Sequence, residues 1–144
     1  MLIALVLAAV TAASVEPHVR DAVLVLGAAD VACTESGRDY ADGAHVLQVV
    51  RSRARSRLLS QYDGTLWTAL WAKHQHAHGC RWPMTLRHLE LGLEFVRDEL
   101  PVEPWAKKAL WYCHLEPEGT CESYCAPGTC LALGTVVHTY YGRP

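Results

Sequence analysis

Six cysteines in 144 residues constrain this chain more than any other feature of its sequence. They are Cys33, Cys80, Cys113, Cys121, Cys125 and Cys130. An even number of cysteines in a small exported domain is typical of disulfides, although the sequence does not select the pairing. Zinc is the alternative, but zinc motifs usually bring paired C-x2-C knuckles and the spacings here are wider. We therefore expect disulfides.

The N-terminus has the pattern of an export signal. Leu2 to Val10 is a short apolar run, and small residues follow at Thr11 to Ser14. The run is shorter than the roughly 20 apolar residues that span a bilayer. We expect residues 1–14 to be a signal peptide and residues 15–144 to be one domain, exported to the periplasm, cell wall or extracellular space. No Lys or Arg precedes the run, so an uncleaved segment with transient membrane association is the alternative.

The charge pattern offers no surface for nucleic acid. The formal net charge is −2, and the chain has no block of like charge long enough to form an interaction tail. Four arginines alternate at positions 51, 53, 55 and 57. We expect them to form the solvated face of a helix, with an anionic glycan or wall polymer as the alternative partner.

Hydrophobic periodicity predicts helices over the first two thirds of the chain. Val19 to Thr34 is apolar almost all round, which is typical of a buried helix, although its Ala22–Leu26 stretch also fits a strand. An amphipathic helix is predicted from Gly43 to Leu59, with Asp42 as its N-cap. Another helical stripe begins near Thr65.

The last third of the chain changes character. A helix is predicted with Pro83 in its first turn and Pro101 after its end. Its apolar face would be Leu86, Leu89, Leu93, Val96 and Leu100. A short helical turn is predicted at 104–110, and aromatic and β-branched residues predict strands at 110–115 and 135–141. The expected fold class is α+β, mainly helical, with a small C-terminal sheet.

Glu35 is the strongest candidate for chemistry. It stands at the end of a nearly all-apolar run, where a carboxylate would be poorly solvated and its pKa raised. A carboxylic acid that stays protonated near neutral pH can act as a general acid. The structural alternative is that Glu35 marks the point where the helix reaches water.

Other chemistries have weaker support. His74, His76 and His78 alternate, which suggests a metal site if the segment is extended, but a surface cluster without metal is the preferred interpretation. The chain has no G-x-S-x-G elbow and no phosphate-binding glycine loop, and its cysteines are expected in disulfides. We therefore expect carboxylate chemistry without a metal or other cofactor.

Several blocks of the sequence resemble the SleB-type cell-wall hydrolases, a family related in fold to lysozyme-like lytic transglycosylases. The similarity includes Thr34-Glu35-Ser36-Gly37, which resembles the Glu-x-x-Gly opening of the family, the apolar helix of Gly43–Val50 and the following Arg53. An apolar pair and a Gln occur within Leu70–Gln75, and the end His138–Tyr141 is similar to the closing His-x-Phe-Tyr of the family. The chain departs from the pattern at other positions. Ser52 replaces the family's Asn, Arg51 replaces an apolar residue, and Trp111–His114 matches the family's Thr-His-Tyr-His only at its last position.

The resemblance implies cleavage of peptidoglycan between N-acetylmuramic acid and N-acetylglucosamine. Glu35 would act as general acid and then as general base. A lytic transglycosylase needs only one carboxylate because the muramic acid's own C6 hydroxyl attacks, whereas a hydrolytic muramidase would need a second, for which Asp39 and Asp42 are the near candidates. The residues expected to contact or orient the substrate are Ser36, Gln75, Tyr112, His114, His138, Tyr140 and Tyr141. The strand tyrosines fit a core role equally well.

Three functions therefore stay in competition. The preferred one is a monomeric, exported peptidoglycan hydrolase, in either phage lysis or bacterial wall remodelling. The first rival is an inactive, disulfide-stabilised wall-binding domain, supported by Ser52 and the altered Trp111–His114 stretch. The second is a metal-dependent wall hydrolase that uses the three alternating histidines.

Overall fold

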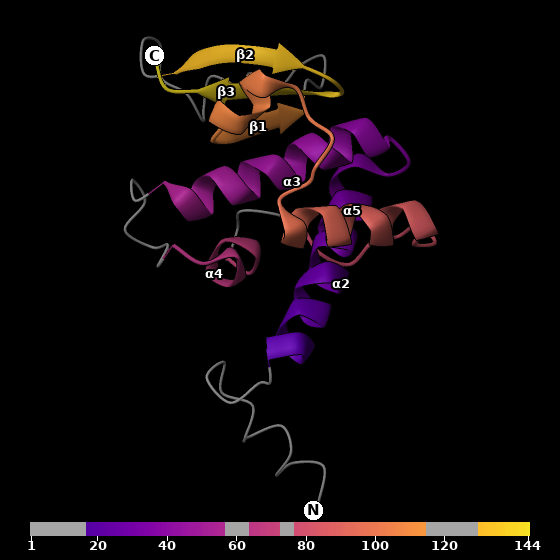
Figure 1. The fold of residues 1–144 in the computed structure, drawn as a ribbon. Coiled ribbons are helices and arrows are strands. Elements are labelled where there is room, and N and C mark those ends of the chain that lie inside the picture. The colour runs from indigo at the N-terminus through magenta and orange to yellow at the C-terminus, as the bar shows by residue number, and fades with distance from the viewer. Residues whose placement is uncertain (1–16, 57–63, 73–76, 115–129) are drawn as a thin grey trace, which may run out of the picture.

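The computed structural model describes residues 17–56, 64–72, 77–114 and 130–144. In this part of the chain, helices precede a small antiparallel sheet, which confirms the α+β, mainly helical fold class (Figure 1). The elements are α2 (Pro17–Ser36), α3 (Tyr40–Arg55), α4 (Leu66–Leu70), α5 (Leu86–Arg97), η1 (Pro104–Lys108), β1 (Trp111–His114), β2 (Leu131–Thr135) and β3 (His138–Gly142). The predicted signal peptide, residues 1–14, lies outside the described residues. No described helix is both long enough and apolar enough to cross a membrane.

Helix α3 is the centre of the fold. It lies between the sheet on one side and the helices α2, α4 and α5 on the other (Figure 1). Its fully buried apolar residues are Ala44, Val46, Leu47, Val49 and Val50. Because neighbours cover the helix on all sides, its polar residues are buried as well.

This position overturns the expected solvated arginine face. Arg51 and Arg53 are only 7% and 5% exposed. Arg51 Nε lies 2.9 Å from Asp98 Oδ1, and Arg53 Nε donates to the Leu110 carbonyl at 2.7 Å. Arg55 is exposed and pairs with the same Asp98, whereas Arg57 lies outside the described residues. The amphipathic pattern identified the helix but not its all-round burial.

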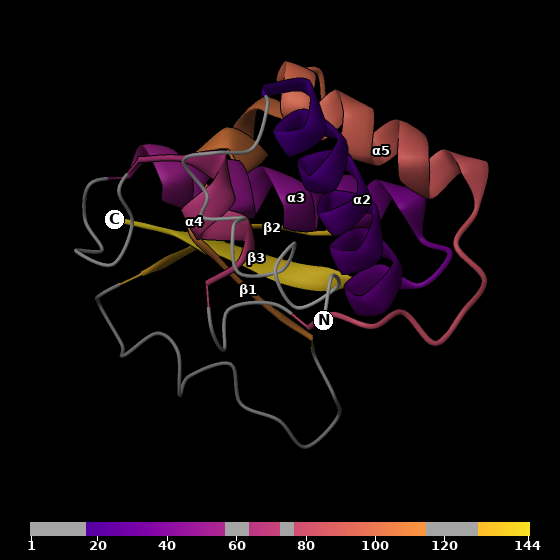
Figure 2. The same ribbon diagram turned by 90° about the horizontal axis from the view of Figure 1, so that it is seen from below.

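Helices α2 and α5 pack side by side over α3 (Figure 2). The start of α5 differs from the prediction, because Thr85 is its N-cap and Pro83 precedes the helix. The predicted apolar face was wrong in part, since Leu86 and Leu93 are 73% and 42% exposed, whereas Leu100 lies in the core and Val96 packs against it. The buried residues of α5 are His88, Leu91, Gly92 and Phe95.

Gly92 explains this choice of face. A Cβ at this position would lie 2.3 Å from the Val25 carbonyl oxygen of α2, so only glycine lets the two helices approach this closely. Backbone approach at Gly92 turns the neighbouring Leu91 and Phe95 into the core and leaves Leu93 toward solvent. Leucine spacing alone does not carry that information.

The sheet has the strand order β1-β3-β2 in the described part of the chain. Strand β1 pairs antiparallel with β3, and Tyr112 lies opposite Tyr140. Strand β2 was not predicted, because Leu131–Thr135 contains Gly134 and follows a stretch rich in Cys and Gly. Gly134 has a packing reason, since a Cβ there would lie 2.5 Å from the Trp105 ring.

The disulfide prediction is confirmed for the described cysteines. Cys33 in α2 is bonded to Cys80, which follows α4, across 47 residues of sequence. Cys113 and Cys130 are disulfide-bonded as well. Cys121 and Cys125 lie outside the described residues. The bond to Cys80 holds the segment that follows α4 against the C-terminal half of α2.

Replacing Gly92 with Ala should destabilise the domain by about 1–3 kcal/mol, the usual cost of overpacking a core contact. The new methyl group would collide with the Val25 backbone carbonyl, which cannot rotate away as a side chain can. Leu93→Ala is the control, because this exposed residue should change the free energy of unfolding by less than about 0.5 kcal/mol. Urea unfolding measures both, and the reverse order would place the buried face of α5 elsewhere.

Candidate functional site

Glu35 lies in the last turn of α2, in a half-buried position at the edge of the core. Its Oε1 accepts a hydrogen bond from the backbone N–H of Ala77 at 2.6 Å. On the side of the sheet, the Glu35 carboxylate lies near the Tyr112 hydroxyl of β1 and helps to raise the pKa of that hydroxyl. The carboxylate is therefore not immersed in apolar side chains, as the sequence suggested, but is held between two polar groups.

Tyr112 connects Glu35 to the rest of the site. Burial, together with the neighbouring Glu35 carboxylate, raises the pKa of the Tyr112 hydroxyl, so this group stays a donor at neutral pH. The Arg53 guanidinium lies over the ring, 5.9 Å from its centroid, and opposes part of that effect. The His138 ring meets the Tyr112 ring edge-on at 5.1 Å. A continuous layer of side chains thus leads from Glu35 into the buried centre.

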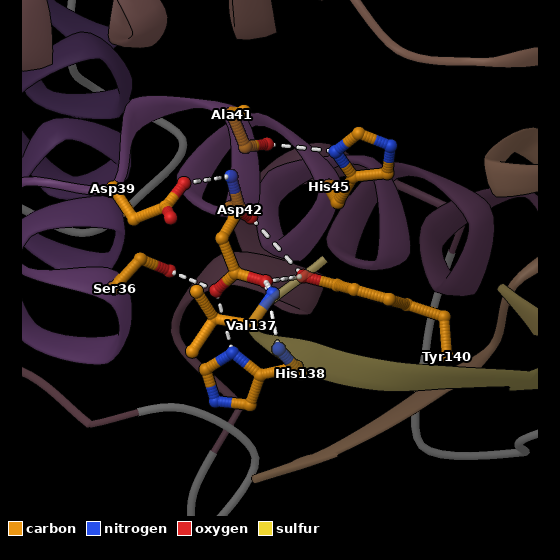
Figure 3. Close-up of polar contacts among 8 residues, drawn as sticks. All are labelled: Ser36, Asp39, Ala41, Asp42, His45, Val137, His138 and Tyr140. Carbon is orange, nitrogen blue, oxygen red and sulfur yellow. Dashed lines mark hydrogen bonds and ion pairs between the residues drawn. The ribbon is translucent and has the colours of Figure 1, made fainter. Parts of the chain in front are cut away.

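Asp42 occupies that centre (Figure 3). It is fully buried in the first turn of α3, and its Oδ2 accepts from Ser36 Oγ at 2.7 Å and from His138 Nδ1 at 2.6 Å. Its Oδ1 accepts from the backbone N–H groups of Val137 and His138 at 3.0 and 2.9 Å. The Tyr140 hydroxyl adds a further bond to Oδ1 at 2.8 Å. Asp42 therefore joins α2, α3 and β3 at one carboxylate.

The hydrogen bonds keep Asp42 ionised. Burial by itself would raise the pKa of this carboxyl, but the bonds from His138 and Ser36 outweigh burial and hold the pKa well below its usual range. Burial and the Asp42 carboxylate in turn raise the pKa of the Tyr140 hydroxyl. A charged acceptor gives shorter and stronger hydrogen bonds than a neutral one, so these donors bind Asp42 firmly.

The turn between α2 and α3 is held in place by a helix cap and by a side chain of α5. Asp39, and not Asp42 as predicted, is the N-cap of α3, and its Oδ1 accepts from the Asp42 N–H at 2.9 Å. Gly37 has φ +57°, a conformation that favours glycine. The buried His88 of α5 donates from Nε2 to the Gly37 carbonyl at 2.7 Å. The backbone that follows Glu35 and Ser36 is therefore rigidly placed.

The segment around Ala77–Cys80 lies along α2. Asp30 accepts from the backbone N–H groups of Gly79 and Cys80, both at 2.9 Å, and these bonds lower its pKa against the effect of burial. His78 Nδ1 lies 3.1 Å from Asp30, its Nε2 lies 3.3 Å from the Leu70 carbonyl, and its ring stacks on Trp71. Both ring nitrogens of His78 thus face protein groups.

That geometry bears on the histidine cluster. The described residues contain no group of three or more His, Cys, Asp or Glu that could hold a metal ion. His74 and His76 lie outside the described residues. His78 connects the Ala77–Cys80 segment to Asp30 of α2. Its ring nitrogens would have to give up their contacts with Asp30 and Leu70 to bind a metal.

The structure gathers five of the predicted site residues in one place, namely Glu35, Ser36, Tyr112, His138 and Tyr140. It does not bring Tyr141 to them, because Tyr141 alternates with Tyr140 along β3 and lies on the other face of the sheet. His114 pairs with His138 in the register of β1 and β3, and only its place in the strand is described. Gln75 lies outside the described residues.

Sequence reasoning missed the two residues that organise this region. Asp42 was interpreted as a cap or a second catalytic carboxylate, although its burial removes it from any substrate. The role of His88 could not be predicted, because nothing in the sequence of a leucine-rich helix indicates that its histidine bonds a turn 51 residues away. The dipeptide Ser36-Gly37 before an acidic cap was the one available sign of a tightly built turn.

Chemically, the arrangement offers the half-buried carboxylate of Glu35 beside buried polar groups. Glu35 can exchange a proton with a bound molecule, and the Tyr112 hydroxyl can donate a hydrogen bond to the carboxylate after it has lost its proton. Asp39, the N-cap, is exposed and engaged with the backbone of α3. No family model, no curated protein and no solved structure matches this chain.

Asp42→Asn should destabilise the domain by roughly 3–5 kcal/mol at pH 7, because an amide cannot accept from all the donors around it. The stabilisation that the ionised Asp42 gives to the wild-type fold changes with pH in one direction. Since the folded pKa is depressed, this stability is fully present above the ordinary carboxyl pKa of about 3.9 and is lost as the pH falls below it. Urea unfolding from pH 7 to pH 3 should therefore show a wild-type minus variant difference that shrinks with acid.

The matched control is Asp21→Asn, at an exposed position of α2, which should change stability by less than about 0.5 kcal/mol. A constant difference between wild type and Asp42→Asn across the pH range would show that the charge of Asp42 contributes nothing to folding.

Proposed function

We propose that this protein cleaves the glycan strands of peptidoglycan, with Glu35 as the general acid and base. The observation that carries the proposal is the position of the half-buried Glu35 carboxylate, which is held by the Ala77 N–H next to Ser36 and the buried network of Asp42. The resemblance of residues 34–53 and 138–141 to cell-wall hydrolases supports the same substrate class. Both the position of Glu35 and this resemblance support an exported enzyme that works without a cofactor.

The proposed reaction is that of a lytic transglycosylase. Glu35 gives its proton to the glycosidic oxygen as the bond from the muramic acid C1 to that oxygen breaks. The resulting carboxylate then takes the proton of the muramic acid C6 hydroxyl, whose oxygen bonds to C1 and closes a 1,6-anhydro ring. One carboxylate suffices for this reaction. The burial of Asp42 favours it over a hydrolytic muramidase, which needs a second accessible carboxylate and would have to use Asp39, the exposed N-cap of α3.

An exposed tryptophan supports a carbohydrate ligand at this place. The Trp82 side chain is 61% exposed, and a Cβ at Gly37, two residues from Glu35, would lie 3.9 Å from its indole nitrogen. The Cys33–Cys80 disulfide anchors the segment that carries Trp82. Large exposed aromatic rings provide apolar contact area together with a polar edge, which suits the faces of sugar rings.

A wall-binding domain without catalysis is the second candidate. It is favoured by the bond from the Ala77 N–H to Glu35, which gives this carboxylate a structural role beside Asp30 in holding the Ala77–Cys80 segment. In that case Glu35 would contribute to stability and not to turnover. The two candidates make opposite predictions for an isosteric variant.

Glu35→Gln should abolish the release of anhydro-muropeptides from purified peptidoglycan, because the amide keeps the shape but cannot donate the proton. Glu99→Gln, at an exposed position beyond α5, is the control and should retain full activity. Mass spectrometry of the digest identifies the products. Reducing ends in place of anhydro ends would indicate a hydrolytic muramidase. Undiminished turnover by Glu35→Gln would exclude Glu35 as the acid, and sacculus binding without products from any protein would identify a binding domain.

Trp82→Ala should weaken binding to glycan fragments by about tenfold while the free energy of unfolding stays within about 0.5 kcal/mol of wild type, since the ring is mostly exposed. Leu86→Ala is the control, because this leucine is 73% exposed at the start of α5, four residues after Trp82. Titration of intrinsic fluorescence with chitooligosaccharides measures the affinity. Equal affinities of the two variants would remove Trp82 from the glycan site.

A further inference from the structure

A basic hollow lies at the opposite end of α3 from Glu35. Its volume is about 410 Å³, and its lining includes Arg55, Lys107, Lys108 and Arg143, without an acidic side chain. Asp42 and Arg55 are 13 positions apart in α3, so the two ends are separated by about 20 Å. The hollow is therefore a separate place on the molecule and not part of the candidate site.

The floor of the hollow is rigid. Ser52, which lines it, donates from Oγ to the Lys107 carbonyl at 3.1 Å and so joins α3 to η1. The buried Arg53 donates to the Leu110 carbonyl at 2.7 Å and fixes the chain beyond η1. The Leu110 N–H in turn bonds the Tyr141 carbonyl at 2.9 Å, which places Arg143 beside the same opening. Charged side chains from three segments are thus presented around one fixed depression.

Most of these cations have no local partner. Arg55 pairs with Asp98, whereas Lys107, Lys108 and Arg143 form no ion pair among the residues that the structure describes. Placing like charges close together costs free energy when no anion lies between them. Arg55, Lys107 and Lys108 also stand at helix C-termini, where positive charge is favourable, but that reason does not extend to Arg143, which follows a strand. The overall charge of −2 shows that the concentration of cations is local.

We propose that this hollow binds a soluble or wall-attached polyanion that carries closely spaced phosphate groups. Arginine guanidinium groups and lysine ammonium groups are the side chains that proteins use for phosphate oxygens. The hollow is shallow and open, so a chain of phosphates can lie across its cations. Of the large exposed apolar side chains that could enter a bilayer, Leu26 and Trp82 lie on other elements, and Leu131, opposite Gly142, lies nearest to the hollow. The site does not depend on the glycan-cleaving activity proposed for Glu35.

The first test is a titration of the protein with sodium tripolyphosphate at low and at physiological salt. Calorimetry measures the affinity, and the backbone amide chemical shifts show which residues bind. Saturable binding with shifts confined to residues 52–56, 107–110 and 141–143 is expected. The double variant Lys107→Gln with Lys108→Gln should lose affinity by about tenfold or more. The double variant Arg81→Gln with Arg97→Gln removes two exposed charges elsewhere and should change affinity by less than about twofold. Equal losses from the two double variants, or shifts scattered over the surface, would overturn the site.

Two further arms identify the ligand. Tricarballylate, a tricarboxylate, should bind more weakly than tripolyphosphate, and equal binding would contradict recognition of phosphate. Vesicles of phosphatidylglycerol should not retain the protein at physiological salt, and retention that depends on Lys107 and Lys108 would replace the polymer with a membrane surface. Glu35→Gln should bind tripolyphosphate as the wild type does, so failure of the glycan-cleaving proposal would leave this result unchanged.

Discussion

One buried carboxylate holds the described fold together. Asp42 receives donors from the end of α2, from the backbone before β3 and from side chains of β3, so β3 and the α2–α3 turn, 96 residues apart in the sequence, converge on two oxygen atoms. Its charge would be costly in the core if any of these donors were missing. Burial of the charge and closure of the fold therefore occur together.

Glu35 derives its position from this arrangement. It precedes Ser36, which is bound to Asp42, and it faces Tyr112, whose strand is paired with the strand that carries His138. On its other side, Asp30 and the disulfide of Cys33 hold the segment that donates to Glu35. A half-exposed carboxylate held from two sides suits a group that must meet a large substrate without moving. The same ties also describe a purely structural residue, and only chemistry separates the two roles.

Interactions between neighbours in the sequence were predicted better than interactions at a distance. The helix that begins at Thr65 and the helical turn at 104–110 were visible because capping residues and apolar spacing are local signals. The errors arose where a distant neighbour decides. Gly92 selects the buried face of α5 through the backbone of α2, and Arg51 is buried because α5 and the chain beyond it cover α3. The unpredicted strand β2 likewise exists only through pairing with β3.

By itself, the sequence determined the fold class, most element positions, the presence of disulfides and the candidate carboxylate Glu35. These follow from composition, periodicity and residue type, which act over a few positions along the chain. The tertiary structure alone decided that Asp42 is a buried acceptor and not a cap, that Tyr140 and Tyr141 lie on opposite faces of the sheet, and that four cations surround one hollow. The physical reason is that burial, register and charge convergence depend on which segments become neighbours in space, and a linear pattern does not encode those distances.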